Sequence, residues 1–337
     1  MKQETNQEYL LEIKDLTTAF LFDGKPVPVT VNVSYGIKKG EILGIVGESG
    51  SGKSVTVKSV LRLLPSPPSS ILNGEIYFHG QNLLTLKEKE MQKIRGNKIS
   101  MIFQEPMTSL NPVYTCGNQI TETIMLHQHL SKEEALKKAA LMLDLVGIPA
   151  PESRLKSYPH QLSGGMRQRV MIAMALSCEP ELLIADEPTT ALDPTIQAQI
   201  ITLIKELRDS IGLSVMYITH DLAVVAEICD RVVVMYAGMV MEIAEIRDLF
   251  HAPLHPYTQG LMQAMPRINQ QSEMLYNIPG MVPHVTQMPT GCRFQPRCPY
   301  ATEVCSQACP ELVDAGDGHM VRCFHYEKLR KERVQNG

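Results

Sequence analysis

The chain has 337 residues, a formal net charge of −4, 44% hydrophobic residues and 20% charged residues. A net charge this small excludes a whole-molecule attraction to nucleic acid or anionic lipid. A membrane-spanning helix needs roughly 20 consecutive apolar residues, and the most apolar stretch, residues 232–241, is interrupted by Tyr236 and Gly238. The first residues show no basic segment leading into an apolar one, so we expect no secretory signal. Any membrane role is therefore expected to come through a partner.

Short β-rich runs alternate with helical stretches from the start of the chain to about residue 250, which is typical of a doubly wound α/β domain. Ile42–Val46 reads as a buried strand, and the helix that follows it is expected at residues 53–64. The other clear strands are expected at residues 99–103, 182–186 and 215–219. These elements predict an α/β fold.

Helices dominate between residues 110 and 180. Ser131 begins a capping box, and the amphipathic helix after it has one apolar stripe: Ala135, Leu136, Ala139, Leu143 and Val146. We expect an inserted helical subdomain at about residues 105–180. Beyond residue 250 the composition changes. Nine prolines lie from Pro253 to Pro310, too many for long helices or central strands. The sequence therefore predicts an α/β domain over residues 1–255 and a loop-rich extension over residues 256–337.

Residues 47–54 fit the pattern G-x-x-x-x-G-K-[ST] and lie between a predicted strand and a predicted helix. Glycines let the backbone fold around an anion, and the helix start adds its positive dipole end. Lys53 can reach the β- and γ-phosphates of a nucleotide, and Ser54 can offer its hydroxyl to Mg²⁺. The candidate nucleotide-binding residues are Gly47, Ser49, Gly50, Ser51, Gly52, Lys53 and Ser54.

Two adjacent carboxylates follow the predicted strand at residues 182–186. Asp186, at the strand end, is well placed to hold the Mg²⁺ shell of a nucleotide. Glu187 can orient a water in line with the γ-phosphate, and such positioning is most of what phosphoryl transfer needs from a protein. The sequence therefore predicts ATP hydrolysis with Glu187 as a catalytic residue.

A second anion-binding element occurs at Ser163, Gly164 and Gly165, which precede a predicted helix. The chain has only one phosphate loop. One nucleotide site and two phosphate-binding elements indicate that two subunits share each nucleotide.

The order of these motifs resembles the ATPase subunits of ABC transporters. The family's signature corresponds to residues 162–166, where Met166 replaces the more common glutamine, and its D-loop corresponds to residues 190–193. The resemblance implies an ABC-type P-loop NTPase fold and a head-to-tail dimer. In that dimer Ser163 and Gly165 would face the γ-phosphate held by the other subunit.

The resemblance also assigns single residues. Gln104 resembles the Q-loop glutamine, which senses Mg²⁺ and the attacking water and couples to the membrane subunit. His220, in the run Thr219-His220-Asp221, resembles the switch histidine that contacts the γ-phosphate. Phe20 resembles the aromatic residue that stacks on adenine, although Phe22 is close enough to leave the choice open.

Within the family, residues 103–112, 162–175 and 255–258 resemble the oligopeptide/dipeptide import branch. The resemblance implies a homologous and different partner ATPase, two permease subunits, an extracytoplasmic substrate-binding protein and a location at the cytoplasmic face of the membrane. Another small solute, such as nickel or an opine, is an alternative cargo. A soluble ABC ATPase that acts on DNA or ribosomes is a further alternative, disfavoured because the span from Ser54 to Ser163 has no room for a long coiled coil.

Of eight cysteines, five crowd between Cys292 and Cys323, whereas Cys116, Cys178 and Cys229 are scattered. Clustered cysteines in a chain without an export signal indicate metal rather than disulfides. The import branch carries a four-cysteine iron–sulfur site here, which implies a 4Fe–4S cluster on four of these thiols: Cys292, Cys298, Cys305 and Cys323. Five and six residues separate the first three, wider than the close pairs of zinc ribbons, although structural zinc remains the alternative. Cys309 is expected to be a spare thiol.

Overall fold

The computed structural model describes residues 9–104, 109–190, 193–265 and 276–336, and the side chains up to residue 331. Residues 105–108 of the predicted Q-loop motif and the D-loop residues Ala191 and Leu192 lie outside the described residues. The chain divides into two compact units. The first unit comprises Met1–Ile37, Leu43–Leu84 and Thr219–Gly337, and the second comprises Lys38–Ile42 and Thr85–Ile218. The predicted domain boundaries at residues 255/256 and at 105–180 stay predictions.

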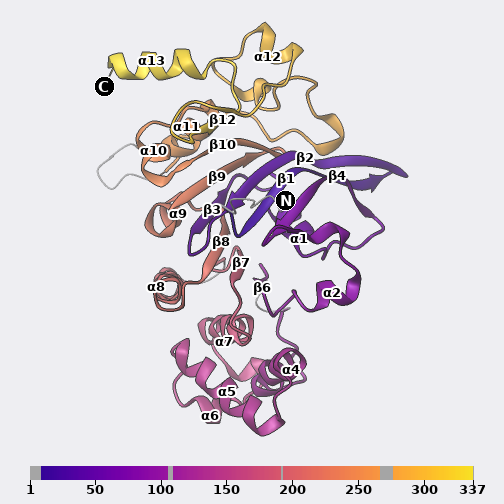
Figure 1. Ribbon diagram of the computed structural model, residues 1–337. Coiled ribbons are helices and arrows are strands. Elements are labelled where there is room, and N and C mark those ends of the chain that lie inside the picture. The colour runs from indigo at the N-terminus through magenta and orange to yellow at the C-terminus, as the bar shows by residue number, and fades with distance from the viewer. Residues whose placement is uncertain (1–8, 105–108, 191–192, 266–275, 337) are drawn as a thin grey trace, which may run out of the picture. The chain divides into compact units, whose positions relative to one another are not determined.

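The first unit contains an antiparallel sheet of strand order β2-β1-β4-β5 (Figure 1). Its strands are β1 (Leu11–Phe22), β2 (Lys25–Ile37), β4 (Ser69–Phe78) and β5 (Gln81–Asn82). β1 and β2 are joined by Asp23 and Gly24, whose φ values of 49° and 74° are those of a two-residue hairpin turn. Leu11, Ile13 and Leu16 of β1 are fully or almost fully buried, so one face of this sheet contributes to the core.

The first unit also contains a mixed sheet in the order β11-β12-β10-β9-β3. The buried strand β3 (Ile42–Val46) pairs in parallel with β9 (Arg231–Tyr236), and β9 forms an antiparallel hairpin with β10 (Met239–Glu245). The apolar stretch at residues 232–241 is this hairpin. The C-terminal extension adds β12 (Met320–Val321) to the edge of β10 and β11 (Val313–Asp314) to β12. The extension is therefore continuous with the sheet that carries the phosphate loop.

The helices of the first unit are short, and all but one have at most eight residues. Their bounds are α1 (Lys53–Val60), α9 (Leu222–Ile228), α10 (Ile246–His251), α11 (Pro256–Gln263), α12 (Glu303–Gln307) and α13 (Tyr326–Asn336), with single turns at η3 (Val285–Gln287) and η4 (Gln295–Arg297). α9 packs on β3, since a Cβ added at Gly44 would lie 2.9 Å from the Cys229 sulfur that follows α9.

The second unit contains three parallel strands, β6 (Ile99–Ile102), β7 (Leu182–Asp186) and β8 (Ser214–Thr219), in the order β8-β7-β6. Its helices α4 to α7 form one helical group (Figure 1). The helical bounds are α2 (Glu88–Gln92), α4 (Cys116–Gln128), α5 (Lys132–Leu145), α6 (Pro151–Arg154), α7 (Gly164–Leu176) and α8 (Pro194–Ile211), with single turns at η1 (Leu83–Thr85) and η2 (Pro159–Gln161). Parallel strands and covering helices confirm the predicted α/β class.

Local sequence signals explain several of these boundaries. The predicted capping box is present: the Ser131 hydroxyl accepts from Glu134 N at 3.3 Å, and the Glu134 carboxylate accepts from Ser131 N at 2.9 Å. The helix expected at residues 53–64 ends earlier, at Val60, because Arg62 takes a left-handed φ of 51°. No helix in the described part of the chain is long and apolar enough to cross a membrane.

Candidate nucleotide site and cysteine cluster

The phosphate loop of the first unit leaves β3 at Val46 and enters α1 at Lys53. Gly47 has φ 153°, and a Cβ there would lie 2.1 Å from the Met235 carbonyl oxygen of β9. Gly52 has φ 93°, and a Cβ there would lie 2.9 Å from Thr30. Both positions therefore require glycine, one for the close approach to β9 and the other for the helix entry.

The Lys53 side chain folds back over the phosphate loop. Its ammonium donates to the carbonyl oxygens of Gly47 at 2.6 Å and Glu48 at 3.1 Å, and to the Ser51 hydroxyl at 3.3 Å. Lys53 is only 6% exposed. The ammonium therefore lies within the phosphate loop at the start of α1, a position that suits the binding of a polyphosphate.

The phosphate loop also receives support from a residue that the sequence analysis missed. Tyr257, at the start of α11, is fully buried, and its hydroxyl oxygen accepts a hydrogen bond from Glu48 N at 2.9 Å. Burial raises the pKa of Tyr257, so the hydroxyl stays protonated at neutral pH. Only the resemblance of residues 255–258 to a family motif marked this position.

Gln104, Glu187 and Thr190 meet at the carboxyl ends of β6 and β7 in the second unit. The Glu187 Oε2 atom accepts from Gln104 Nε2 and from the Thr190 hydroxyl, both at 3.0 Å. Glu187 has φ 50°, a conformation that costs a residue with a side chain roughly 1–2 kcal/mol, and its N–H donates to Ile218 O at 3.0 Å. Asp186, directly before it, is fully buried. The backbone and two side-chain donors thus fix the direction of the Glu187 carboxylate.

Ser163 lies at the amino end of α7, also in the second unit. Its hydroxyl caps the helix by accepting from Met166 N at 3.3 Å. Gly165 faces α8, where an added Cβ would lie 2.9 Å from Ile196. Ser163 and Gly164 are exposed, so the positive end of α7 is open to a ligand or a second chain.

His220 is an exposed residue that directly follows β8 and belongs to the first unit with the phosphate loop. The neighbouring Asp221 receives a hydrogen bond from Ala223 N at 2.9 Å and caps α9. Phe20 and Phe22 lie two positions apart in β1 and are both half-buried. The Phe22 ring makes an edge contact with His284, with centroids 6.4 Å apart.

Four thiols of the extension line one small cavity together with His255 and His325: those of Cys292, Cys298, Cys305 and Cys323. Burial raises the pKa of Cys298 to about 11 and that of Cys323 to about 12. Cys309 lies apart, with its sulfur 4.0 Å from the Met239 sulfur. Within the described ranges, no group of three or more His, Cys, Asp or Glu side chains is spaced to hold a metal ion. The four cysteines predicted as cluster ligands therefore line one cavity without forming a coordination shell, and the cluster stays a prediction.

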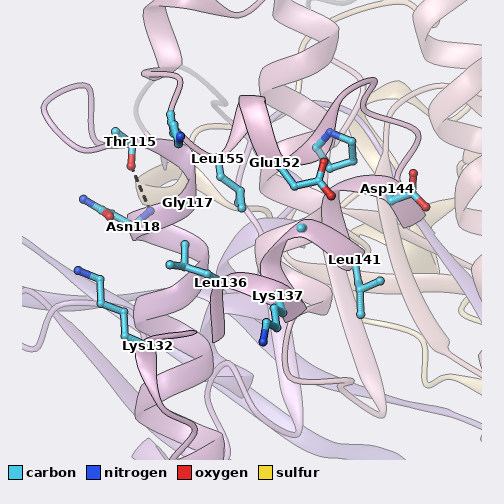
Figure 2. Close-up of a pocket in the computed structure, with 13 residues that line it drawn as sticks. Thr115, Gly117, Asn118, Lys132, Leu136, Lys137, Leu141, Asp144, Glu152 and Leu155 are labelled. Atoms are coloured by element: carbon cyan, nitrogen blue, oxygen red, sulfur yellow. Dashed lines mark hydrogen bonds between the residues drawn. The ribbon is translucent and has the colours of Figure 1, made fainter. Parts of the chain in front are cut away.

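An open cavity of about 940 Å³ lies among α4, α5 and α6 of the second unit (Figure 2). Its wall carries Leu136, Leu141 and Leu155, and charged side chains such as Lys132 and Glu152 lie beside them. Leu141 of this wall is exposed, and so are other large apolar side chains of the second unit: Phe103, Val113, Tyr114, Met125, Leu126, Leu145 and Tyr158. An apolar surface with a charged surround is typical of a contact with another protein.

Comparison with known proteins gives matches along almost the whole chain. A family model described as "ABC transporter" matches residues 30–190, and one described as "Oligopeptide/dipeptide transporter, C-terminal region" matches residues 241–305. A probable peptide ABC transporter ATP-binding protein of Sinorhizobium fredii is 53% identical over 98% of this chain and 98% of its own length. The oligopeptide transport ATP-binding protein OppD of Escherichia coli is 50% identical over 94% of this chain and 93% of its own.

A solved structure matches the fold. It is a dimeric ATP-binding cassette in a post-hydrolysis state, bound to ADP and phosphate. The TM-score is 0.63 and the identity 31%, over 70% of this chain and 99% of the other.

Proposed function

The chain belongs to the ABC-transporter ATP-binding proteins, in their oligopeptide/dipeptide branch, and we propose that its ATP hydrolysis drives the import of peptides through a membrane permease. As a member of this family it is an ATPase. The observation that carries the proposal is the pairing of Gln104 with Glu187 at 3.0 Å in a chain that also has a glycine-dependent phosphate loop. The cargo follows from relatives that share about half of their residues with nearly all of this chain.

In the proposed nucleotide site, the N–H groups of the phosphate loop and the Lys53 ammonium bind the β- and γ-phosphates. Ser54, Gln104 and Asp186 hold the Mg²⁺ ion. Oxygen donors of this kind suit Mg²⁺, which is bound through a few protein groups together with phosphate oxygens. The buried position of Asp186 supports this role, because a buried carboxylate is stable when a cation lies beside it.

Glu187 is proposed to orient and deprotonate the attacking water, with His220 contacting the γ-phosphate. The carboxylate accepts hydrogen bonds from Gln104 and Thr190, which hold it in one orientation, as a water-orienting group requires. Adenine is proposed to stack on Phe20. The edge contact between Phe22 and His284 gives Phe22 a packing role and favours Phe20 for the base.

The working unit is proposed to contain two cassettes, this chain and a homologous but different one. Ser163 and Gly165 at the exposed amino end of α7 would meet the γ-phosphate held by the partner's phosphate loop. The dimeric cassette found among the solved structures supports two-cassette assembly. The complete assembly adds two permease subunits and a substrate-binding protein, and it places this chain at the cytoplasmic face of the membrane.

The helical group of the second unit is proposed to meet the permease. The expected contact is an apolar helix or loop of the permease, because the cavity wall carries leucines, Leu141 among them is exposed, and lysines lie beside them. Substitution of Leu141 by Lys would test the contact: assembly with the permease is expected to weaken while nucleotide binding to the chain persists.

The four cavity-lining thiols are proposed to hold a 4Fe–4S cluster. Two observations support this proposal: the four thiols line one cavity, and the gaps between the first three are wider than those of a zinc ribbon. When bound, the cluster would supply a structural cross-link for a proline-rich segment. The residues themselves exclude water, because Cys305 is buried and the Phe294 ring covers the cavity at 1% exposure. A structural zinc ion is the alternative occupant.

Stimulation of ATP hydrolysis by peptide tests the proposal. In the purified assembly, peptide-loaded binding protein is expected to raise the ATPase rate. Stimulation by nickel or an opine, with no response to peptides, would move the cargo to that solute.

A further inference from the structure

The C-terminal extension reaches the phosphate loop through an ion pair. The Arg297 Nη1 atom lies 2.9 Å from the Glu48 carboxylate, and the Arg297 side chain is 5% exposed against 29% for Glu48. The two residues are 249 positions apart. Glu48 is the second residue of the phosphate loop, and Lys53 donates to its carbonyl oxygen. The loop is thus held from the extension at a residue whose backbone also positions the phosphate-binding lysine.

Arg297 is itself fixed in one orientation. Its Nε atom donates to Pro279 O at 2.9 Å and its Nη2 atom to Ile278 O at 3.1 Å. The guanidinium also lies 5.7 Å from the centre of the Tyr236 ring. A planar guanidinium bound to several partners holds them at fixed positions relative to one another, which a flexible lysine does not do.

The turn that carries Arg297 is tied to the cavity-lining thiols on both sides. Gln295 N donates to Cys292 O at 3.0 Å, and Cys298 N donates to Gln295 O at 3.2 Å. Arg297 is followed directly by Cys298. Any change in order at these two cysteines therefore moves the same turn that holds Glu48.

We propose that Arg297 is a positioning residue for the phosphate loop, linking order in the cysteine-bearing turn to nucleotide affinity. The inference rests on the proposed nucleotide site and adds a coupling to it. By linkage, the coupling is reciprocal: a stable turn favours nucleotide binding, and bound nucleotide stabilises the turn. A purely structural arginine would stabilise the extension without changing nucleotide affinity.

Arg322 provides a matched control within the same extension. Counted over the whole residue, Arg322 is 8% exposed and Arg297 9%, and Arg322 also directly precedes a cavity-lining cysteine, Cys323. Its Nε atom donates to Val240 O at 2.7 Å and its Nη1 atom to Pro310 O at 3.0 Å, away from the phosphate loop. The two arginines thus share burial and neighbourhood but differ in the contact to Glu48.

The first experiment measures Mg-ATP affinity in the full assembly with a fluorescent nucleotide. Arg297→Gln is expected to weaken binding at least about tenfold, because it leaves Glu48 without its buried partner. Arg322→Gln is expected to bind nucleotide as the parent does. Glu48→Gln, which keeps the shape of the side chain and removes the charge that pairs with Arg297, should weaken binding like Arg297→Gln, and the double variant should be no weaker than either one.

The second experiment measures proteolysis of the extension with and without Mg-ATP. Nucleotide should slow cleavage in the parent and, by the same factor, in Arg322→Gln, even if that variant is cut faster overall. Nucleotide should give no protection in Arg297→Gln. Parent affinity in Arg297→Gln, an equal loss in Arg322→Gln, or additive effects in the double variant would overturn the inference. A parent assembly that binds no Mg-ATP would instead overturn the proposed nucleotide site.

Discussion

The side-chain amide of Gln104 donates to the carboxylate of Glu187 over 3.0 Å, although 83 positions separate the two residues. They follow β6 and β7, two parallel strands that pair along their length. The carboxyl ends of such strands are where α/β proteins place ligands. The hydrogen bond therefore joins the residue proposed to sense Mg²⁺ to the residue proposed to orient the attacking water.

Replacing Glu187 by Gln tests the catalytic role of the carboxylate. The amide keeps the shape of the side chain but cannot take a proton from water. Turnover is expected to fall by roughly 10²–10⁴-fold while nucleotide affinity persists. Steady-state hydrolysis and nucleotide binding in the purified assembly measure both quantities. Thr190→Val, which removes one donor and keeps the carboxylate, should cost far less, and near-normal turnover in Glu187→Gln would remove Glu187 from the mechanism.

Replacing Ser163 by Arg tests the sharing of nucleotide sites between two cassettes. The substitution places a long side chain at the exposed amino end of α7. It should disable the site whose phosphate loop belongs to the partner and leave the Lys53 site able to bind nucleotide. Ser131→Arg is the matched control, since Ser131 caps α5 with an equal 3.3 Å bond. An isolated monomer that hydrolysed ATP at the rate of the complex would contradict shared sites.

Elemental analysis tests the four-thiol site. Protein purified without air is expected to contain iron and acid-labile sulfide. A Ser substitution at any one of the four thiols should lose both and make the extension more sensitive to protease. The four positions are Cys292, Cys298, Cys305 and Cys323. Cys309→Ser is the control and should change little, because the Cys309 sulfur lies beside Met239 and outside the cavity. Stoichiometric zinc with no iron or sulfide would contradict the iron–sulfur cluster and indicate a structural zinc site.

Burial of His255 predicts a loss of stability in mild acid. His255 is 1% exposed, and burial lowers its pKa to about 4 from its ordinary value of 6.5. As the pH falls from 6.5 toward 4, His255 is therefore protonated in the unfolded chain but stays neutral in the folded chain. Above pH 6.5 the neutral His255 does not lower the free energy of unfolding. Between pH 6.5 and 4 the protein loses stability, by about 1.4 kcal/mol for each pKa unit between the unfolded and folded values.

The His255→Asn variant isolates this effect. Asparagine can still cap α11, as the His255 ring does by accepting from Tyr257 N at 3.0 Å. Denaturant unfolding at pH 7 and pH 5 should show a smaller loss of stability in the variant than in the parent. Equal losses would assign the acid sensitivity to other groups.

Features encoded locally could be predicted from the sequence. The strand, glycine loop and lysine at residues 42–53 are specified by contiguous residues, and Ser131 with Glu134 gives a helix start that needs no tertiary context. The end of α1 was predicted four residues too late, because Lys53 to Leu64 has helical composition and nothing in it signals the left-handed Arg62.

Features that depend on distant pairing could not be predicted. The two-residue strands β11 and β12 are too short to leave a periodic pattern, and β10, with which β12 pairs, lies more than 70 positions upstream of it. The pairs formed by Glu48 with Arg297 and with Tyr257 span more than 200 positions. Charge complementarity alone does not identify which of the chain's arginines pairs with Glu48. The sequence did not predict the Gln104–Glu187 hydrogen bond: the resemblance to a family marked Gln104, and the position after a predicted strand marked Glu187.

ATP-driven peptide uptake tests the central claim most directly. The assembly would be reconstituted in vesicles with ATP on the side of this chain and labelled peptide with its binding protein on the other. Peptide should accumulate on the ATP side only with hydrolysable nucleotide, and the Glu187→Gln assembly should bind ATP yet accumulate none. Accumulation that does not depend on ATP, or that continues at the parent rate in the Glu187→Gln assembly, would contradict the account.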